Sequence, residues 1–237
     1  MTDAFAAKAA EWDKHPARAA MGQDFHAQVA LAALAHFDGS LAGRTLLDFG
    51  CGTGTLGLRL ALEHALRPVF VDSSPAMLNI LRGKLAELHL PEAVVHEGRL
   101  DTLPLHAESV DLAVSLMALH HVEDAHGALR TLRGLLRPGG LLLLGDLLPE
   151  DGSFHADMRA DMKAGAEGDT EDDTKDGTKD GGDGACHNGF DPEELRRACQ
   201  DMGYAVQRLL PFHMLRKPDG AGLPREYPLF FLAARAV

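Results

Sequence analysis

Residues 45–54 read Thr-Leu-Leu-Asp-Phe-Gly-Cys-Gly-Thr-Gly. An apolar, strand-like run ends with the acidic Asp48 followed by Phe49. A turn with glycines at alternate positions comes directly after it. Residues 55–62 then form an apolar, helix-like run. Glycine lets a backbone bend sharply and approach a ligand with no Cβ in the way, and a helix N-terminus offers free N–H groups to that ligand. The sequence therefore predicts the strand, turn and helix that open a nucleotide-binding α/β domain.

The spacing of the glycines separates three kinds of nucleotide site. The dinucleotide fingerprint G-x-G-x-x-G needs its third glycine where Thr55 stands, and a P-loop needs a Gly-Lys-Ser/Thr that does not follow. An acidic residue followed by x-Gly-x-Gly-x-Gly resembles the first motif of class I S-adenosylmethionine (SAM)-dependent methyltransferases. The resemblance implies that the acidic residue lies beneath the methionine part of SAM and that the turn passes along the ligand. These cofactor-binding candidates are Asp48, Gly50, Cys51, Gly52 and Gly54.

Length and composition favour a globular α/β protein. A chain of 237 residues, 46% of them hydrophobic, can bury a full core. The formal net charge of −12 argues against nucleic acid as the main partner, which needs a basic surface. The three cysteines form no CxxC pair and no zinc spacing, which predicts reduced thiols in the cytoplasm. No secretory signal and no apolar run of roughly 18 residues is present, so we expect no membrane partner. We also expect a monomer or a homodimer.

Strand-like and helix-like runs alternate from residue 24 onward, which predicts a parallel sheet with helices on both faces. The first helix is expected at residues 24–37. A later helix is expected to stop at Pro138-Gly139-Gly140, before a buried strand at 141–148. Two final strands, at 206–215 and 227–233, look like a hairpin. We therefore expect a Rossmann-like, doubly wound, mostly parallel seven-stranded sheet with an antiparallel C-terminal strand, which resembles the methyltransferase sheet.

Four regions are expected along the chain. Residues 1–38 are interpreted as an N-terminal helical lid and residues 39–148 as the SAM-binding core. Residues 149–190 form an acceptor-side segment. Within it, residues 163–187 are acidic and nearly free of large apolar side chains, so they cannot offset their conformational entropy by burial and are expected to be flexible. Residues 191–237 supply a helix and the strand pair that completes the sheet.

The N-terminal region carries the only tryptophan of the chain, Trp12. An exposed tail rarely keeps a tryptophan without a packing role. The resemblance implies that this segment folds over the cofactor and closes the acceptor pocket, and ordinary packing against the sheet is the alternative.

Asp72 closes the second predicted strand, about 20 residues beyond the glycine turn. An acidic side chain at this place accepts hydrogen bonds from both hydroxyls of a ribose, which a SAM site and an NAD site need alike. Ser73 belongs to the same cofactor site, and the resemblance implies that Met77 packs on the adenine. Ser74 can cap the next helix and Pro75 suits its first turn.

Residues 97–104 read Glu-Gly-Arg-Leu-Asp-Thr-Leu-Pro and resemble the family segment Gly-Asp-Ala-x-x-Leu-Pro. In the family the Asp meets the adenine amino group, and the next backbone N–H meets a ring nitrogen. Alignment on the Leu-Pro pair puts Arg99 in place of that Asp. The resemblance then implies that the adenine is contacted by the backbone N–H of Leu100 and by the carboxylate of Asp101. The alternative for Asp101 is that it simply lies in a surface loop.

Residues 116–124 read Leu-Met-Ala-Leu-His-His-Val-Glu-Asp at the end of a predicted strand. Ligands of open α/β sheets bind beyond the carboxyl ends of the strands, so Leu116 is expected to contact the cofactor and the histidines to face the methyl group. The segment resembles that of the ubiquinone and menaquinone biosynthesis methyltransferases, which implies methyl transfer to an O, S, C or N atom of a small-molecule acceptor. His120 or His121 could take the acceptor's proton. They could also only shape the pocket, because positioning alone can suffice for methyl transfer.

Two other functions remain as alternatives. An NAD-dependent oxidoreductase would use Asp72 in the same way, but Thr55 disfavours it. A non-catalytic SAM-binding protein of the same fold is left open by Arg99 and the acidic insertion. The 13 histidines include no His/Glu/Cys set with ligand spacing, so the sequence assigns no residue to a metal.

Overall fold

The computed structural model describes residues 3, 5, 6, 8–90, 92–155, 186–218 and 222–237. The predicted flexible insertion at 163–187 lies outside these residues, apart from its last two. The strands are β1 (Thr45–Phe49), β2 (Arg67–Asp72), β3 (Val94–Glu97), β4 (Val110–Leu116), β5 (Leu136–Leu147), β6 (Tyr204–Pro218) and β7 (Pro224–Ala236). The α-helices are α1 (Pro16–His36), α2 (Thr55–His64), α3 (Pro75–Glu87), α4 (Ala125–Leu135) and α6 (Pro192–Asp201). The short 3-10 helices are η1 (Ala9–Lys14), η2 (Leu100–Thr102), η3 (Leu119–His121) and η4 (Ser153–His155).

The strands form one seven-stranded sheet in the order β3-β2-β1-β4-β5-β7-β6. The first five strands are parallel, and β7 runs antiparallel to both β5 and β6. The predicted Rossmann-like sheet is therefore confirmed, including its antiparallel C-terminal strand. The order reverses between β1 and β4, and ligands of open α/β sheets bind beyond the carboxyl ends of strands at such a switch point.

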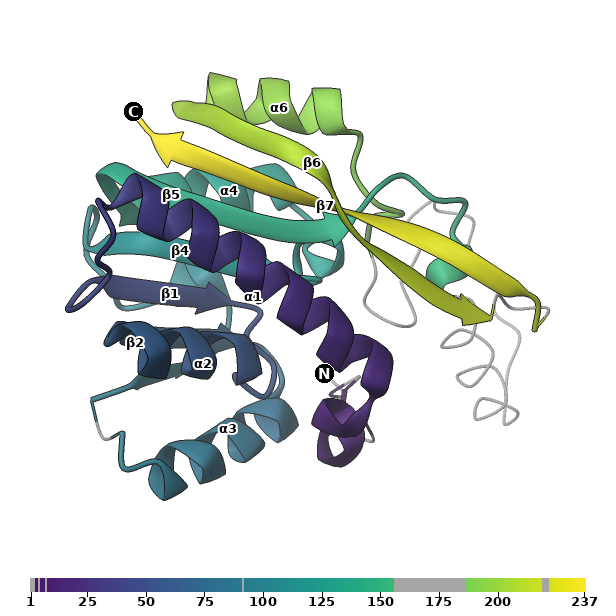
Figure 1. The fold of residues 1–237 in the computed structure, drawn as a ribbon, viewed down its shortest axis with the longest axis horizontal. Coiled ribbons are helices and arrows are strands. Elements are labelled where there is room, and N and C mark those ends of the chain that lie inside the picture. Colours follow the sequence, from purple (N-terminus) through teal and green to yellow (C-terminus); the bar gives the residue numbers. More distant parts are fainter. Residues whose placement is uncertain (1–2, 4, 7, 91, 156–185, 219–221) are drawn as a thin grey trace, which may run out of the picture.

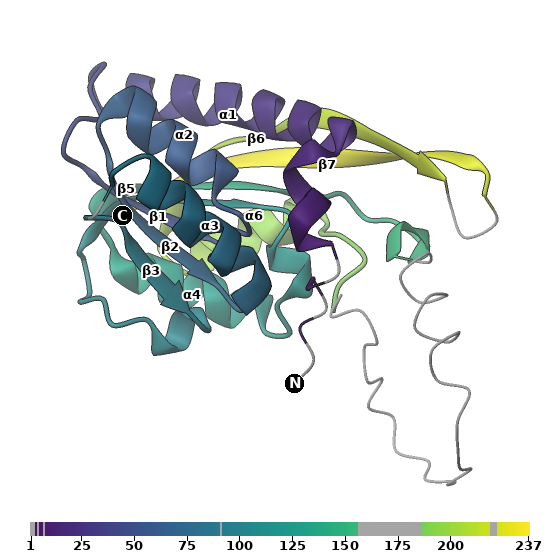
Figure 2. The same cartoon turned by 90° about the horizontal axis from the view of Figure 1, so that it is seen from below.

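Helices cover both faces of the sheet, with α1, α2 and α3 on one side and α4 and α6 on the other (Figure 2). Each face of the sheet packs against its helices in a separate hydrophobic core. Neighbouring residues of β1 contribute to the two cores in turn, because successive side chains of a strand point to opposite faces. Leu46 packs in the cluster with Phe25 and Leu60, whereas Leu47 packs in the cluster with Leu129. Burial on both faces explains why the central strands are nearly continuous apolar runs.

Several predicted boundaries are wrong. The last two strands, predicted at 206–215 and 227–233, are longer at both ends, because β6 and β7 pair from Tyr204 with Ala236 to Pro218 with Pro224. Two further errors concern helices. The first helix begins at Pro16 rather than at residue 24. Residues 16–23 show no apolar stripe, but proline suits the first helical turn and the alanines favour helix. Pro138-Gly139-Gly140 was also predicted to end a helix. Instead α4 already ends at Leu135, and β5 begins at Leu136 and includes these three residues. The three residues lie where the pairing of β4 with β5 shifts register, a place where a strand tolerates proline.

The start of α3 forms as predicted. The Ser74 side chain accepts a hydrogen bond from the backbone N–H of Met77, and Pro75 occupies the first turn. Within the described part of the chain, no helix combines the length and the apolar character needed to cross a membrane.

Candidate cofactor and acceptor site

The glycine turn joins the carboxyl end of β1 to the start of α2. All three glycines have left-handed φ angles, +67°, +54° and +75°, at Gly50, Gly52 and Gly54. The N–H groups of Gly50 and Cys51 both donate to the Val71 carbonyl, at 2.8 and 3.1 Å, which ties the turn to β2. A Cβ on Gly50 would lie 2.1 Å from the Cβ of Ala118, so the turn also packs directly against the segment after β4.

Asp48 lies beneath this turn with only 2% of its surface exposed. Its Oδ2 accepts a hydrogen bond from the Gly57 N–H at 3.1 Å. Burial raises the pKa of the Asp48 carboxyl to about 7, and the nearby charge of Asp72 acts in the same direction. The side chain anchors the first turn of α2 through this hydrogen bond.

The Asp72 carboxylate joins the glycine turn to the loop after β2. Its Oδ2 accepts from the Gly52 N–H at 2.7 Å, and its Oδ1 accepts from the Ser74 N–H at 2.9 Å. Each carboxylate oxygen has a further lone pair that can accept from a ribose hydroxyl. A Cβ on Gly52 would meet only the Trp12 Nε1, at 3.9 Å, so the turn presents bare backbone beside that indole nitrogen. Both features fit the ribose and methionine parts of SAM.

The adenine side is built differently from the family pattern. Leu100 is buried at the start of η2, where its side chain joins the core under α4. Asp101 is exposed, and its Oδ1 lies 3.2 Å from Nε of Arg99 in an exposed ion pair. A pair open to water contributes little stability, so Asp101 can exchange Arg99 for another donor.

The remaining predicted cofactor residues lie around the same strand ends. Cys51 is buried in the turn, and burial raises the pKa of its thiol. Ser73 is exposed directly after β2, while Met77 is buried in the first turn of α3. Leu116 is half-buried at the end of β4 and packs against the core beneath α1.

The N-terminal segment is fastened to the glycine turn. The Oδ1 of Asp13 accepts from the hydroxyls of Thr53 and Thr55, at 2.6 and 2.9 Å. Its Oδ2 lies 2.7 Å from Nζ of Lys84, which also donates to the Thr53 carbonyl at 2.9 Å. This polar cluster places η1 beyond the carboxyl ends of the central strands (Figure 1).

Two further contacts place the N-terminal segment next to both sides of the candidate site. Asp3 accepts from the Ser74 hydroxyl at 2.8 Å and from the Ala76 N–H at 3.1 Å, at the start of α3. The Phe5 ring stands edge-on both to Trp12 and to His121, with centroids 5.8 and 5.5 Å apart. The segment therefore touches the predicted cofactor side and the predicted acceptor side together.

The predicted histidine pair lies at the end of β4, in η3. His120 is 1% exposed, and its Nδ1 lies 2.6 Å from Oδ1 of Asp146 on β5. The Asp146 carboxylate is itself fixed by the N–H groups of His120 and Leu147, at 3.2 and 2.7 Å. His121 is half-buried, and its ring centroid lies 4.1 Å from that of His120.

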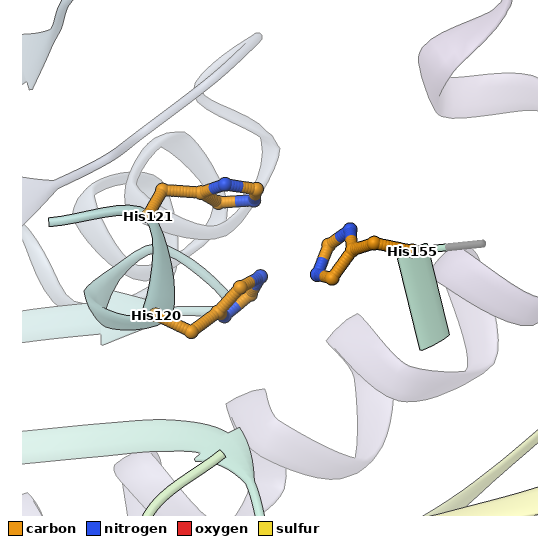
Figure 3. Close-up of side chains that lie close together, drawn as sticks. All are labelled: His120, His121 and His155. Carbon is orange, nitrogen blue, oxygen red and sulfur yellow. The ribbon is translucent and has the colours of Figure 1, made fainter. Parts of the chain in front are cut away.

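The structure adds two residues that the sequence did not single out. Asp146 had a usable signal, because a carboxylate within an otherwise apolar buried strand needs a partner. His155, in η4, had none. Its ring centroid lies 5.1 Å from that of His120 and 5.4 Å from that of His121, and the three rings face a common space (Figure 3).

Comparison with known proteins agrees with this geometry. A family described as a methyltransferase domain matches residues 46–140. The chain is 34% identical over 171 residues to a 37.1 kDa protein in transposon Tn4556 of Streptomyces fradiae, an alignment that covers 71% of this chain and 46% of that protein. It is 32% identical over 119 residues to the 27-O-demethylrifamycin SV methyltransferase of Amycolatopsis mediterranei, with 49% of this chain and 44% of that enzyme covered. The chain thus spans under half the length of these curated relatives.

A solved structure shows the same fold. A SAM-dependent methyltransferase from Aquifex aeolicus superimposes with a TM-score of 0.55 at 18% identity, covering 86% of this chain and 88% of that one. Nothing in these similarities supports the alternative of an NAD-dependent oxidoreductase.

Proposed function

We propose that this chain is a class I SAM-dependent methyltransferase that transfers a methyl group from SAM to an O, S, C or N atom of a small molecule, because a methyltransferase-domain family matches residues 46–140 and the chain has the fold of a solved SAM-dependent methyltransferase. One observation carries the proposal. Asp72 accepts a hydrogen bond from the Gly52 N–H of the glycine turn, and a Cβ on Gly52 would meet only Nε1 of Trp12. The arrangement offers acceptors for ribose hydroxyls and a close approach for the methionine part at the same strand ends.

SAM supplies a methyl group already activated by its positively charged sulfur. The residues of this chain then have to hold, orient and shield the reacting groups. Asp48, Gly50, Cys51, Gly52 and Gly54 are the proposed methionine side of the site. Asp72 and Ser73 are proposed to hold the ribose, with Met77, Leu100, Asp101 and Leu116 around the adenine and the cofactor's inner edge.

His120 and His121 are proposed to line the acceptor side. Asp146 engages Nδ1 of His120, so its Nε2 is left to meet an acceptor group. That nitrogen is buried and has no hydrogen-bond partner among the described residues. A hydroxyl or thiol that donates to it would be oriented for attack on the methyl group.

A small-molecule acceptor is supported by the rifamycin-modifying relative and by the net charge of −12, which disfavours a nucleic acid. Transfer of labelled methyl groups from SAM to a cell extract tests the proposal. Label is expected in the small-molecule fraction. Label confined to protein or nucleic acid would contradict the acceptor class. Tight SAM binding without transfer to any acceptor would favour the non-catalytic alternative.

We also propose that the protein works in the cytoplasm as a monomer or homodimer, without a nucleic-acid or membrane partner. Its cysteines are all free thiols, which supports a reducing compartment.

Asp72→Ala is expected to weaken binding of SAM and of S-adenosylhomocysteine by about 1–3 kcal/mol. The variant removes the carboxylate that would accept from the ribose and that also fixes the Gly52 N–H. Isothermal titration measures the change. Glu87→Ala, which removes an exposed acidic side chain at the far end of α3, serves as the control and should leave the affinity unaltered. Equal affinities of the two variants would remove Asp72 from the ribose role.

The N-terminal segment is proposed to act as a lid, and Trp12 can report its position. Binding of S-adenosylhomocysteine is expected to change the Trp12 fluorescence, because the indole Nε1 lies beside the glycine turn, 3.9 Å from where a Cβ on Gly52 would be. Asp13→Ala removes the carboxylate that holds η1 to Thr53, Thr55 and Lys84, and it should speed ligand release several-fold. Glu11→Ala is the matched control, since Glu11 lies on the same short helix and pairs only with Lys14 among the described ion pairs. Identical release rates for the two variants would argue against a lid.

A further inference from the structure

Three histidines from two separate segments converge at the acceptor side of the site. His120 and His121 belong to η3, after β4, whereas His155 ends η4, beyond β5. One ring nitrogen from each lies within 4.8 Å of the other two. His120 and His155 are almost fully buried, and the rings point inward toward one another (Figure 3). From this cluster we propose that His120, His121 and His155 bind a divalent transition-metal ion.

The orientation of His120 supports this assignment. Its Nδ1 is held at 2.6 Å by Oδ1 of Asp146, which leaves Nε2 as the atom that faces the cluster. This Nε2 is buried and has no hydrogen-bond partner in the described part of the chain. A buried polar atom without a partner is costly. A carboxylate on the far nitrogen of a histidine is also the usual arrangement behind a metal-bound imidazole, because it fixes the ring and raises its basicity.

The surrounding backbone holds both segments in place. The N–H groups of Cys186 and His187 both donate to the His120 carbonyl, at 2.9 and 3.0 Å. On the other side, the Ser153 hydroxyl lies 3.0 Å from the Tyr227 hydroxyl of β7, which anchors η4. The cluster is thus built on packed segments. Tetrahedral Zn–N bonds near 2.0–2.1 Å place the ring nitrogens about 3.4 Å apart, so an ion would have to draw them together by up to about 1.5 Å.

The donor set decides the class of metal. Three imidazole nitrogens suit Zn²⁺, Co²⁺, Ni²⁺ or Fe²⁺, whereas Mg²⁺ and Ca²⁺ prefer oxygen ligands. Three protein ligands also leave a fourth position open, as in catalytic zinc sites.

The open coordination position points to a hydroxyl or thiol as the methyl acceptor, an inference that rests on the proposed methyltransferase function. With the ion on Nε2 of His120, the acceptor hydroxyl or thiol binds the ion instead of donating a hydrogen bond to that nitrogen. Bound to the ion it loses its proton more easily, and that proton leaves to solvent. The oxygen or sulfur then forms its bond to the methyl carbon while the bond from that carbon to the SAM sulfur breaks. The electron pair of the broken bond returns to sulfur, which gives S-adenosylhomocysteine.

Metal binding can be measured without any acceptor. The chelator-treated protein is titrated with Zn²⁺ by calorimetry, and with Co²⁺ by its visible absorption, which reports tetrahedral coordination. Stoichiometric binding is expected for the wild type. His155→Ala should weaken Zn²⁺ binding by about 100-fold or more, and Asp146→Asn by about 10–100-fold.

The matched control is His106→Ala. His106 is exposed in the loop before β4, at the opposite end of the strand from the cluster. This variant should bind Zn²⁺ like the wild type. Equal Zn²⁺ affinity of the His155→Ala and His106→Ala variants would overturn the site, and so would a wild type that takes up no Zn²⁺ or Co²⁺.

Titration with S-adenosylhomocysteine separates this inference from the proposed function. A His155→Ala variant that binds the nucleoside like the wild type is correctly folded, so its loss of metal is local. Binding of S-adenosylhomocysteine without binding of metal would overturn only the metal site. Binding of metal without S-adenosylhomocysteine would overturn the proposed function and leave the metal site standing.

Discussion

Gly50→Ala is expected to abolish SAM binding and to lower the free energy of unfolding by about 3–5 kcal/mol. The new Cβ would lie 2.1 Å from the Cβ of Ala118, a backbone-anchored atom that cannot rotate away. Gly50 also has a φ of +67°, which a residue with a side chain adopts only at a cost. The turn would have to move away from β4, which separates the cofactor side of the site from the histidines. Urea unfolding and isothermal titration measure the two effects.

Gly83→Ala provides the control for this substitution. Gly83 lies within α3, and a Cβ there would meet no atom within 4 Å. Alanine favours helix over glycine by up to about 1 kcal/mol, so this variant should be slightly more stable than the wild type and bind SAM normally. If Gly50→Ala proved as stable as Gly83→Ala, the packing of the turn on Ala118 would be wrong.

The second large effect concerns pH. Asp48 has a pKa near 7 in the folded chain and an ordinary value of 3.8, so the folded state holds its proton more tightly than the unfolded state. The stability from this group is therefore complete below its unfolded pKa and is lost as the pH rises through about 7. Asp48→Asn keeps an oxygen for the Gly57 N–H but cannot ionise. Between about pH 4 and pH 8, we expect the wild type to lose roughly 3–4 kcal/mol relative to this variant.

Chemical unfolding across this pH range gives the comparison directly. Asp101→Asn serves as the control, because its carboxyl is exposed at the surface. Because that variant keeps Asp48, it should lose stability between about pH 4 and pH 8 as the wild type does. A wild-type curve parallel to that of Asp48→Asn would show that Asp48 is not the group that titrates.

The parts of the fold that the sequence predicted are those governed by local rules. The glycine turn, the cap formed by Ser74 and the apolar central strands each follow from neighbouring residues. The start of α1 was missed because its first turns carry alanine rather than an apolar stripe. They are held by contacts with distant parts of the chain, such as Met21 in the cluster with Leu147 and Tyr227.

The candidate site divides in the same way. Asp72 and the glycines follow a short motif, so their positions could be read from spacing alone. The partnership of His120 with Asp146, and the approach of His155, depend on how β4 and β5 pair and on where η4 returns. No local pattern encodes these contacts, which is why histidine spacing in the sequence gave no ligand set. Arg99 shows that a position read from a short motif can also depart from it. It replaces the family's acidic residue, and its side chain is exposed.

Titration of the purified protein with S-adenosylhomocysteine tests the central claim most directly. It needs no knowledge of the acceptor. We predict saturable, stoichiometric binding that is weakened in Asp72→Ala and lost in Gly50→Ala. Absence of binding by both SAM and S-adenosylhomocysteine at about 1 mM ligand, in a wild type shown to be folded, would contradict the account.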